Sequence, residues 1–187
     1  MRSGHIMQEG SAMVGFKFIT FLLLAVLWFS VAHCIAGDNN RQGRVLRRKQ
    51  NYVPQFLVPQ NQIRARVGDP PLRWSKKLAN YAKWWANQRR GDCSLTHSNG
   101  PYGENLFWGS GKAWQPKDAV SAWIGEYKFY NYQRNSCNGY QQCGHYTQIV
   151  WRKTRSVGCA RIICNRGDVF MTCNYDPPGN YIGQKPY

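Results

Sequence analysis

The sequence predicts an α+β domain in which helices cover both sides of a small antiparallel sheet. Two segments carry apolar side chains at helical spacing, and two β-prone segments are joined by a turn. The chain that remains after removal of a predicted signal peptide has an even number of cysteines. The 187 residues suit one domain with a proper core. Hydrophobic residues make up 43% and aromatic residues 14%, which excludes a disordered chain.

Residues 1–36 are predicted to be a secretory signal peptide. Residues 18–31 carry no charge, Lys17 precedes them, and Ala36 supplies a small residue for cleavage. This stretch is shorter than the roughly 20 residues of a membrane span, so an uncleaved anchor is the weaker alternative. Met13 is a second candidate for the first residue. Residues 37–53 are polar and basic, and we expect a flexible arm, a removable pro-segment or a solvated tail without a role.

Removal of the signal peptide changes the counts that bear on function. It takes away Arg2, Lys17 and Glu9, so the net charge falls from +16 to +15. It also removes one of the seven cysteines, Cys34. Six cysteines in a secreted chain indicate three disulfides, for which the count alone leaves fifteen pairings open. Residues 54–187 form the predicted domain.

Helix and strand signals follow in order along this domain. The first helix is expected at residues 56–67, with Pro59 in its first turn. Ser75 is a good N-cap for a second helix that Gly91 closes. Pro116 suits the first turn of a third helix. The apolar stripes of the second and third helices are Leu78, Tyr81, Ala82, Trp85 and Ala86, and Val120, Trp123, Ile124 and Tyr127. Residues 157–164 and 169–175 are β-prone and read as a hairpin.

Four scarce side chains are candidates for one site. His97, Glu104, Glu126 and His145 are the only His and Glu residues of the mature chain. Two imidazoles and two carboxylates are suitable ligands for a divalent ion such as zinc. Their scattered spacing is not a local metal motif, so four ordinary surface or hydrogen-bonded residues are the alternative.

Several motifs resemble one family. Gly-His-Tyr-Thr-Gln-Ile-Val-Trp at residues 144–151 and Phe-Met-Thr-Cys-Asn-Tyr-Asp-Pro-Pro-Gly-Asn-Tyr at 170–181 resemble the two signatures of the CAP superfamily. That superfamily comprises cysteine-rich secretory proteins, antigen 5 and pathogenesis-related class 1 proteins. Residues 81–82, 86–89, 91–93 and 100–106 are similar to its plant pathogenesis-related class 1 branch, here in a basic form.

The resemblance implies a three-layer α–β–α sandwich and a cleft lined by His97, Glu104, Glu126 and His145. Family members can hold a divalent ion such as zinc between the two histidines, although no cofactor is required. The disulfide pairing that the resemblance implies is Cys93–Cys164, Cys137–Cys143 and Cys159–Cys173.

One segment departs from the family pattern. Where the family usually reads His-Asn-x-Ala-Arg, residues 60–64 are Gln-Asn-Gln-Ile-Arg. The altered position is outside the tetrad, so the cleft is expected to persist. The departure instead bears on the packing of the first helix.

Sterol binding is the favoured biochemistry. Aromatic side chains interleaved with Asn and Gln follow Glu126, and the resemblance to a caveolin-type motif implies a lipid-binding loop. These side chains are Tyr127, Phe129, Tyr130, Tyr132 and Tyr140. We expect a monomeric antimicrobial protein that sequesters sterol from a microbial membrane. The positive charge would concentrate it near anionic lipid or an acidic cell-wall polymer. The alternative for some of these rings is core and loop packing.

The last eleven residues suggest a second role. Residues 177–187 match the ending that, in plant relatives, is implicated as a released immune peptide. Two prolines and a glycine predict a non-helical tail, so we expect cleavage between Asp176 and Pro177. A tail that simply covers the sheet is the alternative.

Two other functions are less well supported. A metal-dependent hydrolase would use the His/Glu cleft, but neither Ser98 nor Thr147 beside the histidines lies in an activating motif. The resemblance implies no accepted catalytic activity. Nucleic-acid binding rests on charge alone, and a secreted route argues against it. The expected location is extracellular, in the apoplast or cell wall, with the vacuole as an alternative.

Overall fold

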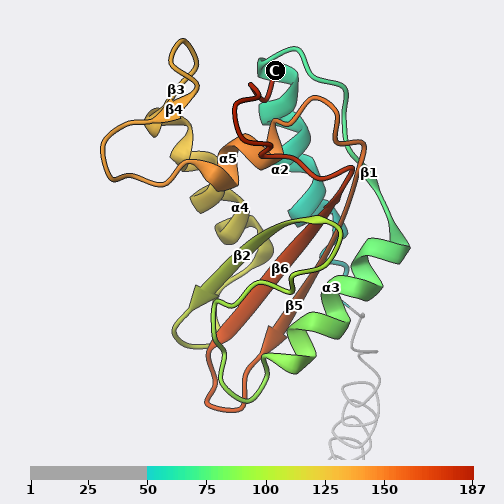
Figure 1. Cartoon of the computed structure of the whole chain (residues 1–187). Helices are drawn as coiled ribbons and strands as arrows, with labels where there is room; N and C mark the ends of the chain where they lie inside the picture. Colours follow the sequence, from blue (N-terminus) through green and yellow to red (C-terminus); the bar gives the residue numbers. More distant parts are fainter. Residues whose placement is uncertain (1–49) are drawn as a thin grey trace, which may run out of the picture. The chain divides into compact units, whose positions relative to one another are not determined.

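A four-stranded sheet lies at the centre of the domain, in the order β1–β5–β6–β2 (Figure 1). The computed structural model describes residues 50–187; the predicted signal peptide and residues 37–49 lie outside this range. The sheet strands are β1 (Arg73–Trp74), β2 (Gly103–Gly109), β5 (Ser156–Ile163) and β6 (Val169–Asp176). The other elements are α2 (Val53–Arg66), α3 (Lys76–Gln88), α4 (Pro116–Gly125), the 3-10 turn η1 (Glu126–Phe129), β3 (Tyr130–Asn131), β4 (Ser136–Cys137) and α5 (Gly144–Ile149).

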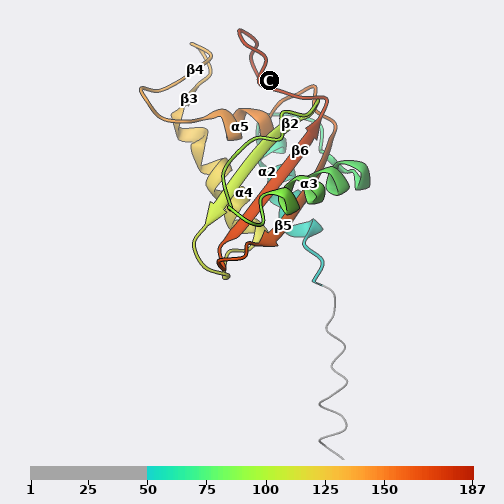
Figure 2. The same ribbon diagram turned by 60° about the horizontal axis from the view of Figure 1, so that its bottom comes forward.

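Helices cover both faces of this sheet, as the sequence predicts (Figure 2). Strand β6 is buried on both sides because its side chains alternate between two cores. Met171 and Tyr175 pack with α2, α4 and α5, whereas Phe170 packs with α3. Gly158 lets α3 approach closely, since a Cβ there would lie 2.2 Å from the backbone nitrogen of Ala79. The three-layer α–β–α architecture is therefore confirmed.

The predicted second and third helices are confirmed, with corrections at their ends. The Ser75 hydroxyl caps α3 by accepting from the Leu78 N–H at 3.3 Å. Helix α3 ends at Gln88, earlier than the expected Gly91. Pro116 begins α4, but Tyr127 lies beyond the helix in η1 and is 59% exposed. The apolar stripe of α4 therefore does not include Tyr127.

The first helix begins earlier than predicted. Helix α2 starts at Val53, which takes the last residue of the predicted arm into the domain, and Pro54 occupies its first turn. Pro59 thus lies inside the helix, where a missing N–H costs a hydrogen bond. Tertiary packing compensates, because one face of α2 is buried: Phe56, Gln60, Ile63 and Arg64.

The predicted hairpin is present, and one strand was not anticipated. Strands β5 and β6 match the predicted segments to within one residue at each end. Strand β2 pairs with β6 along its whole length, although its Gly and Asn residues give no strand pattern. Its pairing with β6 is a long-range contact, which local propensity does not report.

Three disulfides cross-link the domain in the pairing that the resemblance implies: Cys93–Cys164, Cys137–Cys143 and Cys159–Cys173. Cys159 and Cys173 face each other across β5 and β6. Cys93–Cys164 ties the segment after α3 to the sheet. Within residues 50–187, no helix has the length and apolar character needed to cross a membrane.

A buried arginine joins α2 to the end of α5 and to the segment that follows it. The Arg64 guanidinium is fully buried and donates to the carbonyls of Pro70, Ile149, Trp151 and Thr154 at 2.7–3.2 Å. It also forms an ion pair with buried Asp69 at 3.9 Å. One side chain thus supplies hydrogen-bond donors to backbone carbonyls at the end of α5 and in the segment that follows it.

We predict that Arg64→Met lowers the free energy of unfolding by about 3–5 kcal/mol, because it leaves buried carbonyls without their donor and removes one of the two arginine partners of buried Asp69, the other being Arg152. Urea denaturation of the oxidised protein measures the effect. Arg66→Met, at an exposed position two residues later in the same helix, is the matched control, with an expected change within about 0.5 kcal/mol. Equal losses in the two variants would contradict the role assigned to Arg64.

Candidate functional site

Strand β2 positions the first His/Glu pair. Glu104 faces Asn174 of β6 in the sheet register, and the Asn174 amide donates to Glu104 Oε2 at 3.1 Å. The loop before β2 brings His97 Nδ1 to 2.7 Å from Glu104 Oε1, which also accepts from the Ser98 N–H at 3.0 Å. The Glu104 side chain is only 5% exposed, whereas that of His97 is 58% exposed. A buried carboxylate therefore holds an exposed imidazole.

This pair shifts the pKa of both partners. The hydrogen bond to Glu104 raises the pKa of His97 above its ordinary 6.5. Burial acts to raise the pKa of Glu104, but hydrogen bonds from His97, Ser98 and Asn174 outweigh it, so the pKa falls below 4.5. The doubly charged pair is therefore favoured between these two pKa values.

The second pair joins η1 to α5. His145 Nδ1 lies 2.6 Å from Glu126 Oε1, and the backbone N–H groups of His145 and Tyr146 donate to Glu126 Oε2 at 3.0 and 3.3 Å. Glu126 thus binds the first turn of α5 as well as the imidazole. The His145 ring stacks on buried Trp123 with centroids 6.1 Å apart.

Adjacent residues of β2 connect the two pairs. Glu104 forms the first pair, and Asn105 points to the other face, where its amide donates to the His145 carbonyl at 3.0 Å. A hollow of about 290 Å³ is lined by His97, Glu104 and Gln148 of α5. The two pairs therefore lie on either side of one strand end. A single cleft lined by all four side chains stays a prediction.

The described residues do not form a three-ligand metal site. Each histidine directs Nδ1 to a carboxylate, which leaves Nε2 as its ligand atom. Within residues 50–187, no group of three or more His, Cys, Asp or Glu side chains is placed to hold a metal ion. Two imidazoles fall short of the three or four protein ligands usual for zinc. A zinc site at His97 and His145 thus stays a prediction.

The two hydroxyls beside the histidines make other contacts. The Ser98 hydroxyl accepts from the Gly100 N–H at 3.4 Å. The Thr147 hydroxyl donates to Asn180 Oδ1 at 2.7 Å. In the described part of the chain, neither hydroxyl is hydrogen-bonded to a histidine ring, the contact that would activate a nucleophile.

The predicted lipid-binding loop divides into exposed and packed rings. Tyr127, Tyr132 and Tyr140 are 59%, 38% and 106% exposed. Phe129 and Tyr130 are half-buried, and Tyr130 packs against the main core. Burial, with neighbouring tyrosines, raises the pKa of Tyr130 to about 12. Core and loop packing, the alternative to lipid binding, thus accounts for Phe129 and Tyr130.

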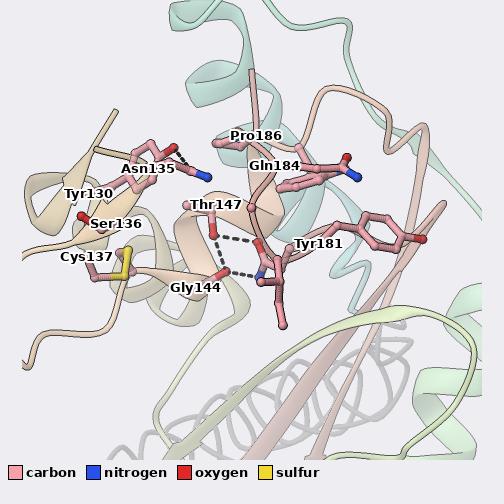
Figure 3. Close-up of a pocket in the computed structure, with 14 residues that line it drawn as sticks. Tyr130, Asn135, Ser136, Cys137, Gly144, Thr147, Tyr181, Gln184 and Pro186 are labelled. Atoms are coloured by element: carbon pink, nitrogen blue, oxygen red, sulfur yellow. Dashed lines mark hydrogen bonds between the residues drawn. A yellow bond between two sulfur atoms is a disulfide. The ribbon is translucent and has the colours of Figure 1, made fainter. Parts of the chain in front are cut away.

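A pocket of about 270 Å³ lies between this loop and the C-terminal tail (Figure 3). Tyr130 and Cys137 lie on one side of it and Tyr181 on the other, with Thr147 between them. Ile182 lines the pocket from the tail and is fully exposed. The pocket therefore combines apolar walls with a polar floor.

The tail, residues 177–187, is bound to the domain. Thr154 donates to the Pro177 carbonyl at 2.9 Å, and the Gly179 N–H donates to Gln148 Oε1 at 3.0 Å. At the other end, the ring of Tyr187 stacks on Tyr132 with centroids 4.9 Å apart. The tail thus covers α5 rather than the sheet, whereas Asp176 and Pro177 are exposed.

Sequence reasoning missed the polar network beneath the second pair. Gln60, at the position that departs from the family pattern, is fully buried and accepts from the Tyr175 hydroxyl at 2.9 Å. That hydroxyl accepts from Asn105, which also binds the His145 carbonyl. The departure bears on the packing of α2, as expected, and here the Gln60 amide oxygen is the acceptor for the buried Tyr175 hydroxyl. The sequence signal that could have predicted this network is Gln60 itself, a polar residue on the apolar face of α2.

Comparisons with known proteins give a consistent result. The profile of the cysteine-rich secretory protein family, CAP, matches residues 58–175. A pathogenesis-related protein PR-1 from Medicago truncatula is 51% identical over 177 residues, which cover 93% of this chain and 100% of the relative. The basic form of pathogenesis-related protein 1 from Nicotiana tabacum is 50% identical over 140 residues, 75% of this chain and 78% of the relative.

Solved structures share the fold. Venom allergen-like protein 4 from Schistosoma mansoni matches with a TM-score of 0.55 and 30% identity, over 76% of this chain and 95% of that one. NaASP2, crystallised with Zn2+, matches with a TM-score of 0.60 and 23% identity, over 73% of this chain and 84% of that one. At that identity the second likeness concerns the fold alone.

We predict that the NMR-measured pKa of His97 lies above 6.5 in the wild type and falls in Glu104→Gln, because the neutral amide no longer favours the imidazolium. The pair's contribution to stability should be lost as the pH rises through the raised His97 pKa. It should also be lost as the pH falls through the lowered Glu104 pKa.

Asp92→Asn is the control for this titration, since Asp92 pairs with Arg89 at 3.3 Å and not with His97. An unchanged His97 pKa in Glu104→Gln would contradict the assignment.

Proposed function

Because the chain belongs to the cysteine-rich secretory protein (CAP) family, we propose that it is a secreted plant defence protein that binds membrane sterols. The defence role rests on the pathogenesis-related proteins of plants, to which it is 50% and 51% identical. Secretion is supported by the uncharged segment at residues 18–31 and by three disulfides, which persist in oxidising compartments.

Exposed aromatic rings beside an open pocket are the observation on which sterol binding rests. Tyr127 and Tyr140 are 59% and 106% exposed, although Tyr127 also contacts buried Tyr146 edge to face with centroids 6.5 Å apart. Neither ring lines the pocket, whose aromatic wall on the loop side is Tyr130. Flat rings suit the flat apolar face of a sterol. Tyr181 and Ile182 add apolar surface on the opposite side of the pocket.

The pocket size favours binding at a membrane surface. At about 270 Å³ it is just below the range of about 300–1,000 Å³ usual for enclosed small-molecule sites. A sterol would therefore be covered only in part and would keep contact with the bilayer. The net charge of +15 that remains after removal of the predicted signal peptide favours approach to anionic lipid.

Release of residues 177–187 as a signalling peptide is the second candidate. Its support is the exposed junction between Asp176 and Pro177, next to a segment with exposed Tyr181 and Ile182. The contacts of Pro177, Gly179 and Tyr187 oppose dissociation. Cleavage and release would therefore be two separate steps.

We predict saturable binding of ergosterol by the folded protein and a dissociation constant at least about tenfold higher in the Tyr127→Ala/Tyr140→Ala double variant. The loss of two exposed rings removes contact area without opening the core. A sterol titration in detergent below its micellar concentration provides the measurement.

Trp84→Ala is the matched control for this titration, because Trp84 is 51% exposed on α3, away from the aromatic loop. The sterol proposal fails if the folded wild type shows no saturable binding, or if the double variant binds as tightly as the control.

We predict that Tyr187→Ala accelerates dissociation of the peptide by about two- to tenfold after cleavage at Asp176, because it removes an aromatic stack worth about 0.5–1.5 kcal/mol. Mass spectrometry after an Asp-specific protease measures the rate. Ile182→Ala, at a fully exposed tail residue, should release at the wild-type rate. Intact C-termini alone in the fluid of stressed tissue would count against a released peptide.

A further inference from the structure

A second hollow lies at the end of the sheet where β5 turns into β6. Its volume is about 380 Å³, and it shares no lining residue with the pocket beside the aromatic loop. Figure 1 shows this turn at the lower end of the sheet and the β3–β4 hairpin at the upper end. The hollow is therefore a separate candidate site.

One wall of the hollow is an exposed aromatic ring. Trp108 projects from edge strand β2 and is 44% exposed, and neighbouring Leu95 is 56% exposed. Trp84 and Trp114 are comparably exposed, at 51% and 40%, but of these three rings it is Trp108 that lines the hollow. The ring offers a flat face to a ligand that enters the hollow.

The frame around the hollow is rigid. The Cys93–Cys164 disulfide lines it and joins the two segments that form it. The Cys164 N–H donates to the Asp168 carbonyl at 2.8 Å, and the Asn165 N–H donates to the Arg90 carbonyl at 2.9 Å. A preformed frame lowers the ordering cost of binding.

One basic residue lines the hollow, and two others lie near it. Arg166 lines it, is exposed, and takes part in no ion pair of the described residues. The Lys112 side chain reaches the same turn, since its Cε lies 3.5 Å from where a Cβ on Gly167 would stand. Arg90 is attached to this end through its hydrogen bond to the Ile163 carbonyl at 2.8 Å.

Two carboxylates also line the hollow, and both are already engaged. Asp92 pairs with Arg89 at 3.3 Å, and Asp168 accepts from the Gly111 N–H at 3.0 Å. Their remaining lone pairs can accept hydrogen bonds from hydroxyl groups. Arg166 is the one cation among the residues that line the hollow, and Arg89 lies next to it through its ion pair with Asp92.

We propose that this hollow binds an anionic oligosaccharide, a chain of uronic acid units. The apolar face of one sugar ring lies on Trp108, its carboxylate pairs with the Arg166 guanidinium, and its hydroxyls donate to Asp92 and Asp168. A neutral sugar would leave Arg166 unused.

This inference goes beyond sterol binding and does not depend on it. A uronate site would retain a basic secreted protein in an acidic polysaccharide matrix, while the aromatic loop stays free.

Calorimetric titration of the full protein with an oligogalacturonate tests the proposal. We expect saturable binding that weakens about tenfold in Trp108→Ala and in Arg166→Gln. Trp84→Ala and Arg134→Gln remove an exposed tryptophan and an exposed arginine elsewhere, and binding should stay within about twofold of the wild type. A neutral cello-oligosaccharide should not bind.

Several results would overturn the proposal. These are the absence of saturable binding, equal losses in Arg166→Gln and Arg134→Gln, or displacement of the oligogalacturonate by a DNA oligonucleotide of equal charge. The last two would indicate unspecific attraction of polyanions. Arg166→Gln lies in an exposed turn and keeps the test valid if Trp108→Ala fails to fold. Unchanged ergosterol binding by both variants would separate this site from the sterol site.

Discussion

The buried guanidinium of Arg64 is the constraint on which the arrangement of α2, α5 and the tail depends. Burial lowers the pKa of this arginine, and Asp69 opposes that shift. The charge is tolerated because four carbonyls and one carboxylate surround it. Through these contacts α2 fixes the end of α5 and the Thr154 carbonyl. The Thr154 hydroxyl in turn binds the tail, so one side chain of the first helix positions elements about 90 residues away in sequence.

Strand β2 connects the core to the two His/Glu pairs of the candidate site. Alternation along a strand sends Glu104 to the side of α3 and Asn105 to the side of α5. Each then binds a different histidine-bearing segment, one through a side chain and one through a backbone carbonyl. The buried chain from Gln60 through Tyr175 to Asn105 connects α2 to the same point. The candidate cleft is therefore coupled to the core on both of its sides.

The aromatic loop and the tail form one structural unit. Tyr132 stacks on Tyr187, and Lys185 lies 4.3 Å from the Tyr132 ring centre. Tyr181 and Ile182 of the tail also form one wall of the pocket in which a sterol is proposed to bind. Loss of the tail would therefore remove that wall as well as uncover Tyr132. In the proposed function, lipid binding and peptide release are consequently linked rather than independent.

Local sequence signals predict the class of the fold, two helices and the β5–β6 hairpin, and they single out the four scarce His and Glu residues. These depend on local signals: apolar spacing, the Ser75 cap, turn residues, and the family motifs at residues 144–151 and 170–181. The tertiary structure alone decided that β2 is a strand, that α2 continues through Pro59, and that Gln60 and Arg64 are buried hydrogen-bonding residues. It also decided which tyrosines of the loop are exposed and that the tail is bound to α5. The physical reason is that burial and pairing across long sequence distances override local propensity, and no short segment records its future partner.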